Sequence, residues 1–96
     1  MRYKFSRKAR EDFLAVHRES VRLFGLMQAE RYADDLFRTF DFLAANPRAA
    51  RQRFEINPPV RIHPHASHLI VYIEAESGIL ILRIRHGREN WAENPA

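Results

Sequence analysis

The sequence predicts a single α+β domain of two layers, in which a helical hairpin packs against an antiparallel sheet. Two long stretches in the first half carry apolar residues at three- and four-residue spacing, which is typical of amphipathic helices. The second half alternates apolar and polar residues with a period of two, which is typical of strands. A short alternating segment precedes the helices. The expected order over residues 1–96 is therefore a strand, two helices and a C-terminal β meander.

Composition limits what this domain does. The chain has 96 residues, of which 46% are hydrophobic, enough for one modest core. It has no cysteine, no long apolar run and no apolar N-terminal signal, so we expect a cytoplasmic protein that does not bind membranes.

Charge suggests the class of partner. The net charge is +4, and fourteen of the sixteen cations are arginine, with local clusters at residues 48–53 and 83–88. Arginine suits planar carboxylates and phosphates. Nucleic acid, a nucleic-acid-handling machine or an acidic protein are candidate partners, and a merely soluble basic domain is the alternative.

The first strand and helix are expected at the start of the chain. Arg2–Phe5 alternates as a short strand, and Ser6 is a favourable N-cap for a helix that continues to about Phe24. Gly25 is a typical C-terminal stop. The expected inward stripe of this helix comprises Ala9, Phe13, Val16, Ser20 and Phe24.

A second helix is expected from about Met27 to Ala45, ended by Asn46 and Pro47. The connection between the two helices is short, so they should form an antiparallel hairpin. The expected buried face of the second helix comprises Ala29, Ala33, Leu36, Phe40 and Leu43.

The second half is expected to form the sheet. A short edge strand is predicted from Phe54 to Ile56, followed by a proline-rich turn. Three strands follow between Val60 and Trp91, the last two joined by a tight turn. If Glu74 faces Ile79, one face of the sheet carries Val60, Ile62, Leu69, Val71, Ile73, Leu80, Leu82 and Ile84, and we expect the helices to cover it.

The opposite face is then half apolar and half basic. It would carry Ile70, Tyr72, Ile79, Ile81, Arg61, His63, Arg83 and Arg85. We expect this face to be open and to serve as a docking platform for another macromolecule. The alternative is that the C-terminal tail folds back and covers it with Trp91.

Two further chemistries are weaker hypotheses. His63, His65 and His68 are spaced so that two rings could meet one metal ion, but no nearby carboxylate or cysteine supports this, and a stacking or hydrogen-bonding role is preferred. No metal or other cofactor is therefore expected.

A nuclease would need an acid, a base and phosphate-binding cations. The suitable residue types are present as Glu55, Arg61, Arg83, Arg85 and His86.

Several segments together resemble the RelE/ParE toxin superfamily, and most closely its ParE branch. They are Tyr3 with Phe5-Ser6, Ala9 and Asp12; Gln28-Ala29 with Tyr32; Leu43 with Asn46-Pro47; Arg61 with residues 65–72; and residues 81–84 with His86, Gly87, Arg88 and Trp91. This resemblance implies a helical hairpin against an antiparallel sheet, with the first strand beside the last.

The resemblance also implies a function. ParE-like toxins of type II toxin–antitoxin systems inhibit DNA gyrase and are not known as enzymes. A ParD-like antitoxin neutralises them and binds operator DNA itself, so operator DNA would be an indirect partner of this chain. The alternatives are a RelE-type ribosome-dependent mRNA endoribonuclease and a non-toxic corepressor. Gly87 stands where some of the nucleases carry a tyrosine, and lysines are missing from this half, which favours the gyrase type.

Candidate site residues follow from the predicted open face and from the resemblance. No catalytic residue is expected. The residues expected to bind the target are Arg61, His63, Arg83, Arg85, His86, Arg88 and Trp91. The residues expected to bind the antitoxin are Leu14, His17, Val21, Phe42, Ile70, Tyr72, Ile79 and Ile81.

Overall fold

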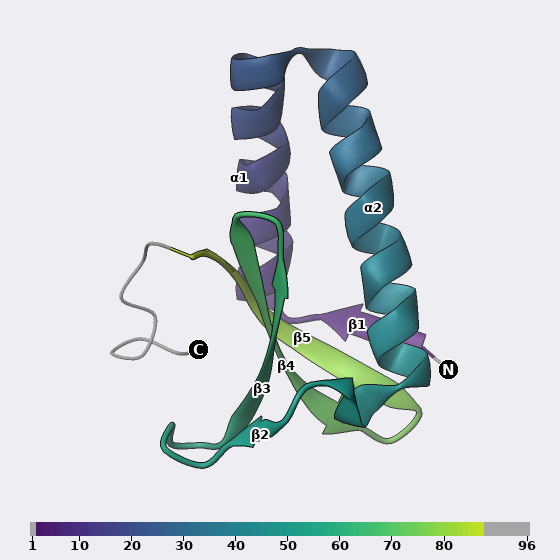
Figure 1. Ribbon diagram of the computed structural model, residues 1–96, viewed down its shortest axis with the longest axis vertical. Helices are drawn as coiled ribbons and strands as arrows, with labels where there is room; N and C mark the ends of the chain where they lie inside the picture. Colours follow the sequence, from purple (N-terminus) through teal and green to yellow (C-terminus); the bar gives the residue numbers. More distant parts are fainter. Residues whose placement is uncertain (1, 88–96) are drawn as a thin grey trace.

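Two antiparallel helices and a five-stranded sheet form the two layers of the fold in the computed structural model, which describes residues 2–87 (Figure 1). The elements are β1 (Arg2–Phe5), α1 (Arg7–Phe24), α2 (Leu26–Ala45), the 3-10 helix η1 (Pro47–Ala49), β2 (Gln52–Arg53), β3 (Val60–His65), β4 (His68–Ala75) and β5 (Gly78–His86). The strand order is β1-β5-β4-β3-β2. Only the β1–β5 pair is parallel among these strands. The predicted fold class and the placing of the first strand beside the last are confirmed.

Local sequence signals set the helix ends. The Ser6 hydroxyl accepts a hydrogen bond from the Ala9 N–H at 3.0 Å, which satisfies one of the free donors at the start of α1. Gly25 has a φ of 87°, a conformation that favours glycine, and its N–H donates to the Val21 carbonyl at 2.9 Å. The predicted helix ends are therefore confirmed to within one residue.

The helical hairpin covers the sheet face opposite to the one expected. All five residues predicted for the inner face of α2 are buried, as expected. Three of them, Leu36, Phe40 and Leu43, share one core cluster with Ile70, Tyr72, Ile79 and Ile81, and each of these four sheet residues is at most 1% exposed. The prediction that this sheet face is open was wrong. Both faces of the sheet are apolar along β4 and β5, so periodicity could not show which one the helices cover.

A β-bulge separates the two halves of the β4–β5 ladder. Glu74 faces Ile79 as predicted, and the pairing continues to Tyr72 and Ile81. Leu82 is then an extra residue, because Val71 pairs with Arg83 and not with Leu82.

The bulge changes which side chains lie beneath the helices. Beyond it, Ile70 pairs with Ile84, and both belong to the core that packs against the helices. The expectation that Ile84 shares a sheet face with Leu69 was therefore wrong.

The second sheet face has its own small core. Ile56, Val60, Ile62 and Val71 are buried there, and Leu69, Ile73 and Leu82 pack around them. Ile56 comes from the β2–β3 connection, and only 4% of it is exposed. The edge strand predicted from Phe54 to Ile56 was wrong, because β2 ends at Arg53 and Ile56 instead covers the sheet.

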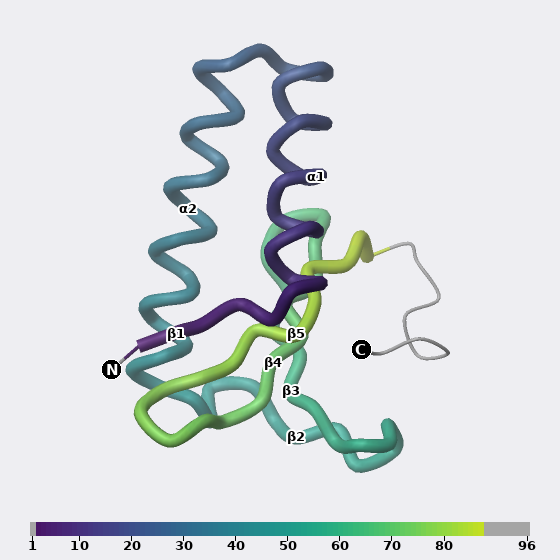
Figure 2. The backbone as a smooth tube through the Cα atoms, turned by 180° about the vertical axis from the view of Figure 1, so that it is seen from behind, coloured from purple at the N-terminus to yellow at the C-terminus, as the bar shows by residue number. Residues whose placement is uncertain are grey.

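The helices extend past the sheet. The α1–α2 connection projects beyond the β3–β4 turn, whereas η1 and β2 lie at the other end of the molecule (Figures 1 and 2). Leu23, Phe24, Leu26 and Met27 at this connection are all more than half exposed. No helix within residues 2–87 combines the length and apolar character needed to span a bilayer.

Gly78 should be intolerant of any side chain. It has a φ of 152°, and a Cβ there would lie 1.6 Å from the carbonyl oxygen of Arg2 in β1. Gly78→Ala should therefore lower the free energy of unfolding by at least about 2 kcal/mol, by forcing β1 away from β5. Urea denaturation followed by circular dichroism measures this.

Gly25→Ala is the matched control. Gly25 also has a positive φ, but nothing lies within 4 Å of the position that a Cβ would take there. Gly25→Ala should lose only the strain of alanine in this backbone conformation, about 1 to 3 kcal/mol, and less than Gly78→Ala, in which the clash with Arg2 is added. Equal losses in the two variants would show that the contact with Arg2 is not what requires glycine at position 78.

Candidate functional site

The arginines expected on one open platform do not share a face. Arg61 pairs with Tyr72, whose side chain lies beneath the helices, whereas Arg85 pairs with Leu69 on the second face. The prediction of a single basic platform formed by Arg61, Arg83 and Arg85 was wrong. The bulge at Leu82 is the reason, because it changes the side-chain alternation along β5.

Arg83 forms an ion pair within the fold. Its Nε lies 2.7 Å from Oδ2 of Asp12, and its Nη2 lies 3.1 Å from Oδ1. The backbone N–H of Ile84 also donates to Oδ2, at 3.0 Å. Less than a fifth of either charged side chain is exposed. This carboxylate thus joins α1 to β5.

The same end of α1 covers an edge of the sheet. β1 pairs with β5 only as far as Ile81. Beyond that point the Ser6 N–H donates to the Ile81 carbonyl at 2.9 Å, and the Ser6 hydroxyl donates to the Leu82 carbonyl at 2.8 Å. Ser6 and Asp12 therefore satisfy backbone groups that a neighbouring strand would otherwise satisfy.

Arg61 takes part in a second polar cluster, at the other end of the sheet. Its Nη1 donates to the Ala50 carbonyl at 2.7 Å and its Nη2 to Oε1 of Glu74 at 3.0 Å. The Nε of Arg48 donates to the same oxygen at 3.2 Å. The side chain of Arg61 is 14% exposed, whereas that of Arg48 is 83% exposed. The cluster of arginines at residues 48–53 is visible in the sequence. The contact of Arg48 with Glu74 is not, because the two residues are 26 positions apart.

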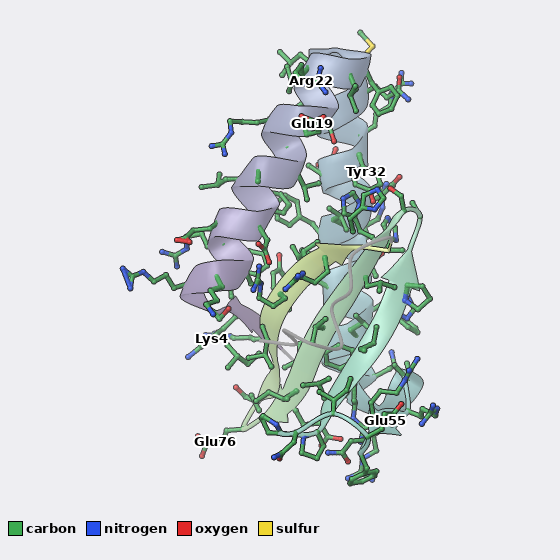
Figure 3. All side chains as sticks on the ribbon, turned by 90° about the vertical axis from the view of Figure 1, so that its left-hand side faces the viewer. Lys4, Glu19, Arg22, Tyr32, Glu55 and Glu76 are labelled. Carbon is green, nitrogen blue, oxygen red and sulfur yellow. The ribbon has the colours of Figure 1, made fainter. Side chains whose placement is uncertain are left out.

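The histidines connect the β3–β4 turn to α2. The Tyr32 hydroxyl lies 2.7 Å from Nδ1 of His68 and 3.3 Å from the carbonyl oxygen of His65. Oγ1 of Thr39 lies 3.2 Å from Nδ1 of His65, and the rings of His68 and His86 are 5.6 Å apart. Figure 3 shows Tyr32 beside this turn. Stacking and hydrogen bonding, the preferred interpretation of these histidines, describe their contacts.

No metal cluster was found among the described residues. Within residues 2–87, no three His, Asp or Glu side chains are placed to hold a metal ion together. His63 lies apart from Tyr32, with its ring 6.4 Å from that of Phe42.

Burial shifts the pKa values of two of these side chains, His63 and Tyr32. Burial lowers the pKa of His63, and the nearby His65 lowers it further. Burial raises the pKa of Tyr32, although a hydrogen bond to Ser67 opposes the shift. Both shifts favour the uncharged form of the side chain.

Half of the residues expected to bind an antitoxin are buried. Ile70, Tyr72, Ile79 and Ile81 lie beneath the chain's own helices, so the expectation that they are exposed was wrong. The others lie on the helices: Leu14 and Phe42 are about half exposed, Val21 is half-buried, and Nε2 of His17 lies 3.3 Å from Glu30. For these four, antitoxin binding stays a prediction.

The candidate nuclease residues do not converge. Glu55 lies 3.8 Å from Arg51 and 3.6 Å from Arg53, in the connection that precedes β3. His86 pairs with His68, which in turn pairs with His65 at the far end of β3. Glu55 and His86 are therefore separated by the length of β3. Five residue steps along a strand span about 17 Å. Arg88 and Trp91 lie outside the described residues.

Comparisons with known proteins agree on one family. Residues 3–91 match the family model of the ParE toxin of the type II toxin-antitoxin system parDE. Toxin ParE1 of Mycobacterium tuberculosis, from strains CDC 1551 and H37Rv, is 38% identical over 66 residues, which cover 68% of this chain and 67% of the relative. A solved chain of the chromosomal ParDE system from P. aeruginosa superposes with a TM-score of 0.74 at 29% identity, covering 90% of this chain and 95% of that one.

Removal of the Asp12 carboxylate should destabilise the whole domain. Asp12→Ala takes from Arg83 its bidentate partner and from the Ile84 N–H its acceptor. The free energy of unfolding should fall by about 2 to 4 kcal/mol, as measured by urea denaturation. Asp35→Ala breaks an exposed pair with Arg38 and should cost less than about 1 kcal/mol. Similar losses in both variants would contradict a structural role for Asp12.

Proposed function

This chain belongs to the family of ParE toxins of type II toxin–antitoxin systems, and from that premise we propose that it inhibits DNA gyrase and is neutralised by a ParD-like antitoxin. The observation that supports this most strongly is the family match, which spans residues 3–91. The similar solved structure comes from a toxin–antitoxin system, which supports an antitoxin as the direct partner. Operator DNA is then contacted only through that antitoxin.

Inhibition by binding, without catalysis, is the proposed mode of action. Phosphate-ester cleavage needs cations and proton-transfer groups around one phosphate. Here Arg61 and Arg83 are held by Glu74 and Asp12, at separate places on the sheet. The dispersal of these cations, together with the separation of Glu55 from His86, supports a toxin that binds its target.

The end of β5 is the proposed contact region for the target. Arg85 and His86 are its last charged and polar positions, and Arg88 and Trp91 follow in the sequence. Arg83 is assigned a different role, because its bidentate contact with Asp12 fixes the strand to which Arg85 and His86 belong. Arg61 and His63 lie on β3 and are not part of this region.

The test is a supercoiling assay with purified gyrase. The chain should inhibit supercoiling, and the double variant Arg85→Ala/Arg88→Ala should inhibit at least about tenfold less strongly, because contacts of this kind dominate binding energies. Its unfolding midpoint should stay close to that of the parent. Arg18→Ala/Arg22→Ala, which removes two exposed arginines from α1, is the control and should inhibit normally.

A translation assay with ribosomes, run in parallel, separates the alternatives. Cleavage of message that His86→Ala abolishes would replace the gyrase proposal with a RelE-type endoribonuclease. Neutral overexpression, with no effect in either assay, would instead indicate a corepressor. A fully active Arg85→Ala/Arg88→Ala variant would show that the end of β5 is not the target contact.

A further inference from the structure

Two adjoining hollows meet at the ion pair between Arg48 and Glu74. The first has a volume of about 540 Å³ and is lined by Arg48, Gln52, Pro59, Val60, Arg61, Ile73 and Glu74. The second has a volume of about 380 Å³ and is lined by Phe42, Asn46, Pro47, Arg48, Ala49 and Glu74. We call the two together the Arg48 groove. It lies near η1 and β2, at the end of the molecule away from the α1–α2 connection (Figure 1).

The charged half of the groove has more cations than anions. Arg48 and Arg61 both donate to a single oxygen of Glu74, so two guanidinium groups share one carboxylate. Arg51 and Arg53 lie close by in sequence, and Glu55 is 3.8 and 3.6 Å from them. These four arginines thus carry more positive charge than Glu55 and Glu74 carry negative charge.

The apolar half adds a place for a side chain. Phe42 is 50% exposed and lines this hollow together with Pro47, Ala49 and the charged pair. Such a hollow beside a guanidinium suits a segment in which an apolar residue neighbours a carboxylate. The exposed Arg48 can turn toward an incoming acid, whereas Arg61 is fixed by its bond to the Ala50 carbonyl.

We propose that the Arg48 groove binds an acidic, apolar-containing segment of the antitoxin. A carboxylate of that segment replaces Glu74 as the partner of Arg48, and a neighbouring apolar side chain fills the hollow beside Phe42. This inference rests on the proposed function, because it names the partner's chemistry and the place where it binds. The proposal places this antitoxin contact away from the end of β5, where the target contact is proposed.

A protein segment suits this groove better than a nucleic acid does. Glu74 lines both halves of the groove and is 40% exposed, so a chain of phosphates laid along the groove would meet its carboxylate. A single carboxylate that replaces Glu74 as the partner of Arg48 brings only one negative charge to this half of the groove. The hollow beside Phe42 is lined mostly by apolar atoms of the chain, which a phosphate backbone cannot use.

Charge reversal at Arg48 tests the proposal. Isothermal titration calorimetry measures the affinity of the chain for the antitoxin encoded beside its gene. Arg48→Glu should weaken that affinity at least about tenfold and should leave gyrase inhibition unchanged. Lys4→Glu is the control, because it makes the same charge change at an exposed position of β1, outside the residues predicted to bind the antitoxin or the target. It should bind the antitoxin as the parent does.

Glu74→Gln gives a second test, with an effect of opposite sign. The amide keeps an acceptor for Arg61 but no longer competes as an anion for Arg48. Antitoxin affinity should therefore rise severalfold. A lower antitoxin affinity would mean that Glu74 itself contacts a cation of the partner. It would overturn the proposal that a carboxylate of the antitoxin replaces Glu74 at Arg48.

The remaining outcomes separate this inference from the proposed function. If Arg48→Glu is neutralised as well as the parent, the groove is not the antitoxin site, although the toxin assignment stands. If Arg48→Glu loses gyrase inhibition but keeps antitoxin affinity, the groove belongs to the target. If single-stranded RNA binds the parent but not Arg48→Glu, the occupant is a nucleic acid. If no neighbouring antitoxin binds or neutralises the parent, the proposed function fails as well.

Discussion

One extra residue in β5 determines how the two faces of the sheet are used. Leu82 has no partner of its own between the Tyr72–Ile81 and Val71–Arg83 pairs, so side-chain alternation shifts at that point. Ile84 joins the core beneath the helices, and Arg85 takes its place on the other face beside Leu69. An uninterrupted ladder would have carried arginine into the apolar layer. The bulge avoids that cost, which is why the helices can cover β5 along most of its length.

The start of α1 completes this arrangement. β1 covers β5 only up to Ile81, so the strand that follows the bulge would present unpaired backbone groups. Ser6 and Asp12 bind these groups, and Asp12 also neutralises Arg83. A short polar segment and one carboxylate thus replace an additional strand. The same contacts hold the second half of β5, and with it Arg85 and His86, against the rest of the domain.

The two ends of the sheet are chemically different. At one end, His65, His68 and Tyr32 tie the β3–β4 turn to α2, and the last residues of β5 lie beside them. At the other, Arg48 and Arg61 share Glu74 at the edge of an open groove. Assigning the target to the first end and the antitoxin to the second lets neutralisation act without the two partners competing for the same residues.

Sequence periodicity and local end signals predicted most of the secondary structure. The order of elements, the helix ends at Ser6 and Gly25, the buried face of α2 and the turn before Ile79 all follow from local spacing, caps and turn residues, which act over a few positions. The grouping of Val60, Ile62 and Val71 on one face was also visible, because alternation identifies which side chains lie together. The family resemblance added the placing of β1 beside β5, whereas the parallel direction of that pair was not predicted.

Tertiary structure alone decided which face the helices cover and where the charged groups meet. Both faces of β4 are apolar, so alternation cannot rank them, and a bulge changes the pattern without a distinctive residue to mark it. The pairs Asp12–Arg83 and Arg48–Glu74 join positions 71 and 26 residues apart, beyond the reach of any local pattern. The sequence by itself determined the elements and the family. The packing of those elements decided which arginines hold the fold together and which stay exposed, because an arginine's role depends on the nearest carboxylate in space.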